Sequence, residues 1–185
     1  MALLRGVNVG GKNRLPMRDL AALFAKAGAE EAETFIQSGN VVFRARPRVA
    51  ARLPETVAAA IFERYGHRTP ILTRTVAELA ELVRANPFAK AGVDLATLHV
   101  AFLRDPPSAE RVAALDAARS PPDEFLVRKR EIYLRLPNGV ARTRLTNAWF
   151  DSALATTATL RNWRTVQRLL ELAGRRSRDP RGGRP

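Results

Sequence analysis

The feature that most constrains the fold is a short sequence that occurs twice, each time at the start of a similar pattern. Residues 2–6 read Ala-Leu-Leu-Arg-Gly, and residues 101–105 read Ala-Phe-Leu-Arg-Asp. After each copy, the spacing of apolar residues predicts a helix, a strand, a hairpin turn, a second strand and a helix. A duplicated βαββα unit is the simplest explanation, and it indicates an α+β protein.

The first half begins with an expected buried strand over residues 2–5. A helix is expected between Pro16 and Gly28. Proline is common in the first turn of a helix, and glycine is common at the position just after its end. The β-rich runs 35–36 and 41–43 flank a turn and predict a hairpin. A second helix that stops at Gly66 and a strand at 71–73 complete the order βαββαβ, which is ferredoxin-like.

A capping box at Thr75–Glu78 predicts a connecting helix that ends at Asn86-Pro87. The second half then supplies, in order, a strand at 98–103, a helix at 108–118, strands at 125–127 and 132–134, and closing helices at 145–154 and 159–173. We therefore expect two ferredoxin-like βαββ(αβ) units, with antiparallel sheets and helices packed on them. Their expected bounds are 1–74 and 92–173, with a connecting helix at 75–91 and a disordered basic tail at 174–185.

The absence of cysteine excludes disulfides, thiolate metal sites and thiol nucleophiles. It agrees with a reducing compartment, so we expect a cytoplasmic protein. No apolar run approaches the roughly 18 residues of a membrane span, and no basic region precedes an apolar one at the start of the chain. We expect neither a membrane nor a cofactor among its partners, and the oligomeric state stays open.

The net charge of +13 is consistent with nucleic-acid binding, because basic proteins release counterions from phosphate backbones. Part of this charge comes from the arginines of the C-terminal tail, and arginine greatly outnumbers lysine throughout. A solvated basic surface without a specific partner explains the charge equally well. Nonspecific nucleic-acid binding through the tail and the last expected helix, where Arg161, Arg164 and Arg168 share a face, stays an alternative.

The two halves differ most in one loop. The second half passes from Arg104 almost directly to a helix, whereas residues 6–15 intervene in the first half. This insertion is rich in glycine, which lets backbone amides approach a ligand closely, and Lys12 can balance a negative charge. Its spacing resembles a P-loop, but Asn13 stands where a P-loop needs Ser or Thr for magnesium. Alternatively, the glycines only permit tight turns.

We predict that the insertion and three further polar segments bind a ligand. The hairpin turn could reach such a ligand, although turn chemistry alone also explains its residues. Hydroxyl and guanidinium groups before the helix at 145–154 suit an oxyanion, unless Thr143 or Thr146 only caps that helix. The predicted ligand-binding residues are Arg5, Asn8, Gly10, Gly11, Lys12, Ser38, Gly39, Asn40, Arg142, Thr143, Arg144, Arg161 and Asn162.

Four separated motifs resemble those of the bacterial domain-of-unknown-function family DUF 1697. They are Leu3-Leu4-Arg5-Gly6-Val7-Asn8-Val9-Gly10-Gly11, Ser38-Gly39-Asn40-Val41-Val42-Phe43, Asn86-Pro87-Phe88 and Thr159-x-Arg161-Asn162-Trp163-x-Thr165-Val166. The resemblance extends from Met1 to about Ala173 and implies ferredoxin-like repeats and an uncharacterised activity. Members usually carry a few residues before the first strand, where this chain has Met1. They more often show Gly, Ser and Lys where this chain has Ala141, Thr143 and Arg144.

The histidines do not point to a metal or to a hydrolase. We expect His67 at the surface and His99 as a structural residue in a strand, with a general base as the alternative for His99. Two distant histidines and no acidic cluster argue against a metal site, and no catalytic triad is recognisable. Trp163 is expected in the core.

Three functions therefore stay open. The first is binding of a phosphate-bearing or other anionic ligand at the glycine-rich loop. The second is an enzyme that acts on a nucleotide or phosphoester at the same cleft, with catalytic residues unknown. The third is the nonspecific nucleic-acid binding described above.

Overall fold

The structure is a computed structural model that describes residues 1–178. The chain divides into two compact units, each built around one four-stranded antiparallel sheet. Of the described residues, the first unit comprises 1–78 and 169–178, and the second comprises 79–168. No helix within residues 1–178 is both long and apolar enough to span a membrane.

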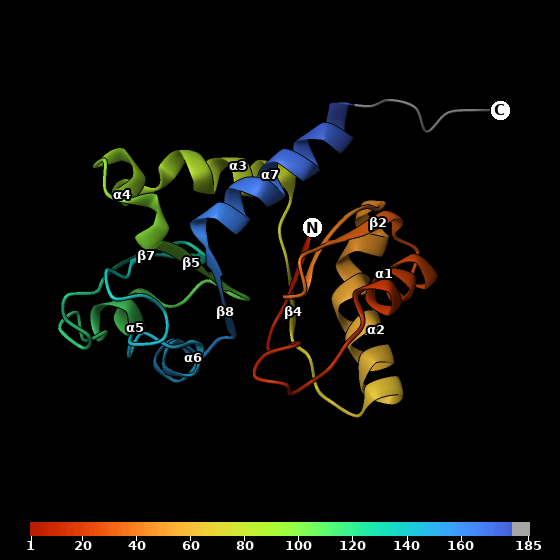
Figure 1. Cartoon of the computed structure of the whole chain (residues 1–185), viewed down its shortest axis with the longest axis horizontal. Coiled ribbons are helices and arrows are strands. Elements are labelled where there is room, and N and C mark those ends of the chain that lie inside the picture. Colours follow the sequence, from red (N-terminus) through yellow and green to blue (C-terminus); the bar gives the residue numbers. More distant parts are fainter. Residues whose placement is uncertain (179–185) are drawn as a thin grey trace. The chain divides into compact units, whose positions relative to one another are not determined.

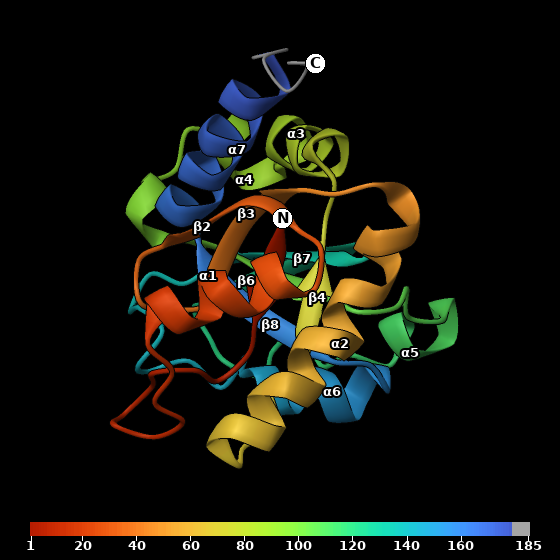
Figure 2. The same ribbon diagram turned by 90° about the vertical axis from the view of Figure 1, so that its right-hand side faces the viewer.

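The first unit has the predicted order of elements. They are β1 (Ala2–Leu4), α1 (Met17–Lys26), β2 (Glu30–Phe35), β3 (Asn40–Arg44), α2 (Pro47–Tyr65) and β4 (Ile71–Thr73). The strands lie in the order β2-β3-β1-β4, and α1 and α2 lie side by side on one face of this sheet (Figures 1 and 2). The ferredoxin-like prediction is confirmed.

Local signals in the sequence explain the helix bounds of this unit. Pro47 opens α2, and Gly66 ends it in a left-handed conformation with φ 73°, which glycine adopts without a steric penalty. Buried side chains of α1 and α2 then meet β1, β3 and β4 in one core. Its fully buried members include Leu4, Leu20, Phe24, Val41, Leu53, Val57 and Ile61.

The predicted capping box is present. The Thr75 hydroxyl accepts from the Glu78 amide at 3.1 Å, and the Glu78 carboxylate accepts from the Thr75 amide at 2.8 Å. This box opens α3 (Val76–Ala85), which is followed by the short α4 (Pro87–Lys90). Asn86 separates them, because its side-chain oxygen accepts from the first amides of α4.

The second unit repeats the arrangement of the first. Its elements are η1 (Leu95–Thr97), β5 (Leu98–Leu103), α5 (Ala109–Ala113), β6 (Glu124–Arg128), β7 (Glu131–Arg135), α6 (Asn147–Leu154) and β8 (Ala158–Asn162). The strand order β6-β7-β5-β8 is the order of the first sheet with each strand replaced by its counterpart. The duplication is therefore visible in the topology and extends to a complete βαββαβ unit.

The end of the second unit differs from the prediction. The helix expected from Thr159 is wrong in its first turn, because residues 158–162 form β8, which pairs antiparallel with β5. Only tertiary pairing selects the extended form here, since the segment is too short for periodicity to decide. Helix α7 (Trp163–Arg178) follows. Residues 174–178 are thus helical, and the rest of the predicted tail, 179–185, lies outside the described residues.

The helix expected over 108–118 is also shorter than predicted, since α5 ends at Ala113. The Asp116 side chain accepts from the Ala118 amide at 2.9 Å. Such a local side-chain bond competes with the helical pattern. The alanine-rich sequence therefore predicts a longer helix than the structure contains.

Candidate functional site

Three connections of the first unit meet at one end of its sheet. They are the loop after β1 (5–16), the turn between β2 and β3 (36–39) and the segment before β4 (66–70). The Leu4 amide donates to the Gly39 carbonyl at 2.7 Å, and the Arg5 amide donates to the Pro70 carbonyl at 2.9 Å. They meet because β1 lies between β3 and β4 and is antiparallel to both. We call this region the loop end.

The glycine-rich loop forms a small β-hairpin. The Lys12 amide donates to the Val9 carbonyl at 3.0 Å, and the Asn8 amide donates to the Asn13 carbonyl at 3.1 Å. The two central residues, Gly10 and Gly11, have φ values of 57° and 75°, which defines a turn of type I′. A P-loop nest alternates right- and left-handed residues instead, so this loop offers an exposed tip rather than an enclosing cradle.

Asn8 fixes this hairpin to its surroundings. Its side-chain oxygen accepts from the Leu15 amide at 2.9 Å, and its side-chain nitrogen donates to the Leu15 carbonyl at 2.9 Å and the Gln37 carbonyl at 3.0 Å. The backbone of Asn8 is left-handed, with φ 55°, and asparagine tolerates this conformation well. Asn8 therefore positions the loop through contacts within the protein.

The predicted turn residues Ser38, Gly39 and Asn40 lie directly beside this loop. Asn40 is fully buried, and its side-chain nitrogen donates to the Ser38 hydroxyl at 2.8 Å and the Phe35 carbonyl at 3.2 Å. A Cβ added to Gly39 would lie 2.6 Å from a Val7 methyl group. Close packing thus explains the glycine, and hydrogen bonds within the turn explain the two polar residues.

The loop end exposes cations and aliphatic groups together. Lys12 and Arg14 are exposed and Arg5 is half-buried, and no carboxylate occurs in the sequence from Arg5 to Arg18. Val9 in the hairpin is 64% exposed and Ile36 in the neighbouring turn is 50% exposed. Ile36 was expected in a strand, and no pattern in the sequence indicates that it ends in an exposed turn.

His67 does not lie at the surface as expected. It is half-buried, and its Nδ1 lies 3.0 Å from the Thr69 hydroxyl. Nearby in the chain, the Tyr65 hydroxyl donates to the Asp19 carboxylate at 2.6 Å, and Arg64 pairs with the same carboxylate. These contacts join the end of α2 to the start of α1 and stabilise the helix pair beside the loop end.

A shallow groove of about 540 Å³ runs between α1 and α2. Its lining consists of three alanines, one leucine, one threonine and three charged side chains. The lining residues are Ala22, Leu23, Lys26, Ala27, Thr56, Ala60, Glu63 and Arg64. The sequence did not indicate this groove, because three of its lining residues are alanines, which are common in any helix.

The predicted segment 142–144 belongs to the second unit. The Arg144 amide donates to the Ser120 hydroxyl at 3.0 Å, and the Arg144 carbonyl accepts from the Arg119 side chain at 3.3 Å. Thr143 accepts from the Leu145 amide, and Thr146 caps α6 by accepting from the Trp149 amide. Of the two threonines considered as caps, Thr146 is therefore the one that caps α6.

Arg161 and Asn162 also lie in the second unit, in β8 rather than in a helix. Arg161 is buried and donates to the Thr159 hydroxyl at 2.9 Å and the Leu160 carbonyl at 2.8 Å. Burial lowers the pKa of its guanidinium to about 10. Asn162 begins α7, since its side-chain oxygen accepts from the Thr165 amide at 2.8 Å. Arg161 therefore does not share a helical face with Arg164.

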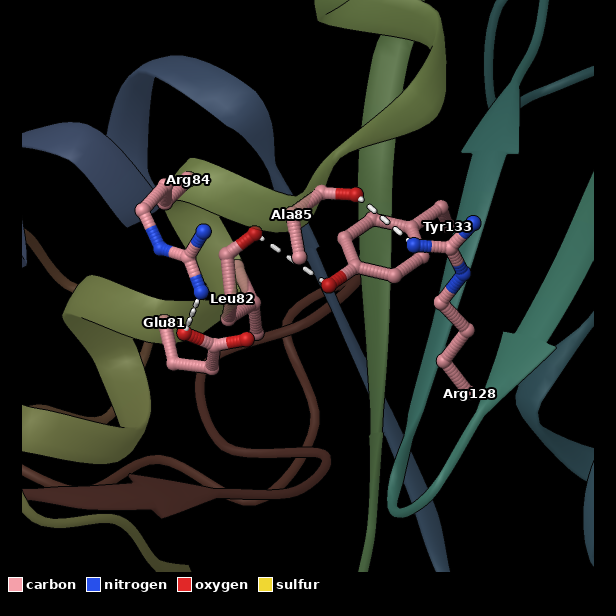
Figure 3. A network of polar contacts seen from close by, with 6 residues as sticks. All are labelled: Glu81, Leu82, Arg84, Ala85, Arg128 and Tyr133. Atoms are coloured by element: carbon pink, nitrogen blue, oxygen red, sulfur yellow. Dashed lines mark hydrogen bonds and ion pairs between the residues drawn. The ribbon is translucent and has the colours of Figure 1, made fainter.

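A network in the second unit holds the end of α3 (Figure 3). The Tyr133 hydroxyl of β7 donates to the Leu82 carbonyl at 3.2 Å, and Arg128 of β6 donates to the Ala85 carbonyl at 3.3 Å. These side chains satisfy carbonyls of the last helical turn. Burial raises the pKa of Tyr133 to about 12, so this phenol acts as a structural donor at neutral pH.

His99 is a buried residue of β5, and its Nδ1 lies 3.2 Å from the Thr97 carbonyl. Burial lowers its pKa below the ordinary value of histidine. No group of three or more acidic, histidine or cysteine residues within 1–178 could hold a metal ion. Within the described residues, the loop end thus contains more of the predicted ligand-binding residues than any other region.

Comparison with known proteins supports the assignment made from the motifs. The family model described as a protein of unknown function, DUF1697, matches residues 1–133. A solved structure, that of the conserved bacterial protein SP0830 from Streptococcus pneumoniae, is similar with a TM-score of 0.68 and 22% identity over 93% of this chain and 96% of that chain. At this identity the likeness shows the fold alone. No curated protein matches the chain. The family match covers well over half of the sequence, so the chain belongs to the DUF1697 family.

Proposed function

We propose that the loop end binds a phosphate-bearing or otherwise anionic ligand, with the turn from Val9 to Lys12 as the main contact. The observation that carries this proposal is the preformed tip, where the backbone of two glycines and an exposed lysine side chain stand next to one another. Because the turn is already folded, binding would not require the chain to order itself first.

The glycine backbone is accessible. Within the described residues, no protein acceptor takes the amide protons of Gly10 and Gly11. A Cβ added at either position would find nothing within 4 Å, so a ligand can approach the backbone closely. Although the turn is not a nest, its backbone amides can each donate one hydrogen bond to an anionic oxygen.

The local charge favours the same ligand class. Lys12 and Arg14 are exposed, and the chain from Arg5 to Arg18 contains four cations and no carboxylate. Guanidinium and ammonium groups form charge-assisted hydrogen bonds with phosphate. Asn8, Gly39 and Asn40 then contribute by holding the turns in place, and the proposed contact uses residues of the first unit only.

Isothermal titration with inorganic phosphate, glycerol phosphate and nucleoside monophosphates tests this proposal. The wild-type chain should bind at least one of these ligands with a salt-dependent affinity. Lys12→Gln should weaken that binding about fivefold to tenfold, because it removes one charge-assisted hydrogen bond.

The matched control is Lys90→Gln, which removes an exposed lysine of the second unit. Both variants change the net charge by the same amount, so a purely nonspecific attraction would weaken equally in both. Equal effects, or no binding by any ligand of the panel, would refute the proposed site.

A further inference from the structure

The loop end carries two aliphatic side chains that face water on neighbouring turns. Val9 and Ile36 are 64% and 50% exposed, and their turns are joined by the hydrogen bond from the Asn8 side chain to the Gln37 carbonyl at 3.0 Å. A single exposed aliphatic residue needs no explanation. Here two exposed aliphatic residues lie on adjoining turns of a region that also carries the exposed cations Lys12 and Arg14.

Ile36 is unusual in its backbone as well as in its exposure. Its φ is 50°, in the left-handed region that is strongly unfavourable for a β-branched residue. Asparagine or glycine would relieve the strain and would also remove an apolar surface from water. Neither fold stability nor solubility therefore explains an isoleucine here, and strained residues of this kind cluster at functional sites.

We infer that the loop end docks on an anionic lipid surface, an inference that rests on the phosphate-binding role proposed above. Lys12 and Arg14 contact the phosphates of the headgroups, and Val9 and Ile36 enter the apolar boundary beneath them. The lack of a membrane-spanning helix within residues 1–178 does not oppose this contact, because peripheral binding needs only exposed apolar groups and cations.

The side-chain chemistry favours a lipid surface over a nucleic acid. Both partners offer phosphates, but single-stranded nucleic acids are held by aromatic side chains that stack on bases. Val9 and Ile36, the exposed large apolar residues of the loop end, are aliphatic, and transfer of such side chains from water into hydrocarbon is favourable. The hydrogen bond from Asn8 to the Gln37 carbonyl joins the two turns that carry these groups.

Cosedimentation of the full chain with vesicles tests this inference. The wild-type chain should bind vesicles of phosphatidylcholine with phosphatidylglycerol, more weakly at high salt, and should show little binding to phosphatidylcholine alone. Val9→Ser should lower the partition coefficient about tenfold, since it removes one buried aliphatic side chain.

Ile36→Asn separates docking from folding. Because asparagine tolerates the left-handed backbone, this variant should melt at the same or a higher temperature than the wild type, while its vesicle binding falls about tenfold. Val140→Ser is the matched control, because Val140 is 48% exposed and lies in the second unit. It should leave vesicle binding unchanged.

Three results would overturn the inference. One is the absence of binding to anionic vesicles, and another is an equal loss in Val9→Ser and Val140→Ser. The third is binding to a single-stranded oligonucleotide that is tighter than binding to anionic vesicles and that weakens in Val9→Ser. If soluble phosphates bind but vesicles do not, only the lipid docking fails, whereas failure of both ligands removes the proposed function as well.

Discussion

The side-chain amide of Asn8 donates to the Gln37 carbonyl at 3.0 Å and thereby joins two turns that are 29 residues apart in the chain. The same side chain also exchanges two hydrogen bonds with the backbone of Leu15. The geometry of the loop end thus depends on Asn8, a residue that the sequence alone predicts to contact a ligand.

Asn8→Ala should destabilise the fold by about 2 to 3 kcal/mol, because it leaves backbone groups without partners and places alanine in a left-handed conformation. Urea unfolding measures this loss. Asn138→Ala, at an exposed position, should change stability by less than about 0.5 kcal/mol. Equal stability of the two variants would show that Asn8 does not hold the loop.

Gly39→Ala and Gly66→Ala form a second matched pair. Both glycines are left-handed, with φ values of 71° and 73°, but an added Cβ meets Val7 at 2.6 Å and Leu4 at 2.7 Å in the first case and nothing within 4 Å in the second. We expect Gly66→Ala to cost about 1 kcal/mol and Gly39→Ala about 2 to 4 kcal/mol. Thermal unfolding should rank them in that order, and the reverse order would contradict the packing at Gly39.

Tyr133→Phe should destabilise the second unit by about 1 to 2 kcal/mol, since the Leu82 carbonyl loses its donor. The raised pKa of Tyr133, about 12, also predicts a pH effect. The stability that the protonated Tyr133 hydroxyl contributes is complete below the ordinary tyrosine pKa of about 10. It is lost as the pH rises through the pKa that Tyr133 has in the folded chain. An ultraviolet difference titration between wild type and variant should show a phenol that ionises above the ordinary range, and ionisation near 10 would disprove its burial.

His99→Asn should change how the free energy of unfolding depends on pH. Because burial lowers the pKa of His99 in the folded state, the unfolded chain binds a proton more readily, and folding stability falls as the pH drops below about 6.5. The wild type should therefore lose stability relative to His99→Asn between pH 6.5 and more acidic values. Urea unfolding of both chains measures this difference, and a constant difference across that range would exclude the effect.

Much of the fold follows from local signals in the sequence. The stop at Gly66, the capping box at Thr75–Glu78 and the alternation of apolar residues each predict an element that the structure contains. These signals work because they depend on backbone preferences and on neighbours a few residues away. The repeated motif at residues 2 and 101 likewise predicts the duplication seen in the two strand orders.

Other features depended on partners that are distant in sequence. Residues 158–162 form a strand because their backbone pairs with β5. For the same reason Arg161 is buried in a sheet rather than exposed on a helix. At the loop end, the sequence by itself determined that glycines and cations would lie between a strand and a helix. Only the tertiary structure decided that the Asn8 side chain holds the turns together, because its hydrogen-bond partner Gln37 lies 29 residues away in the chain. Only the structure likewise shows Ile36 exposed with a left-handed backbone in the adjoining turn.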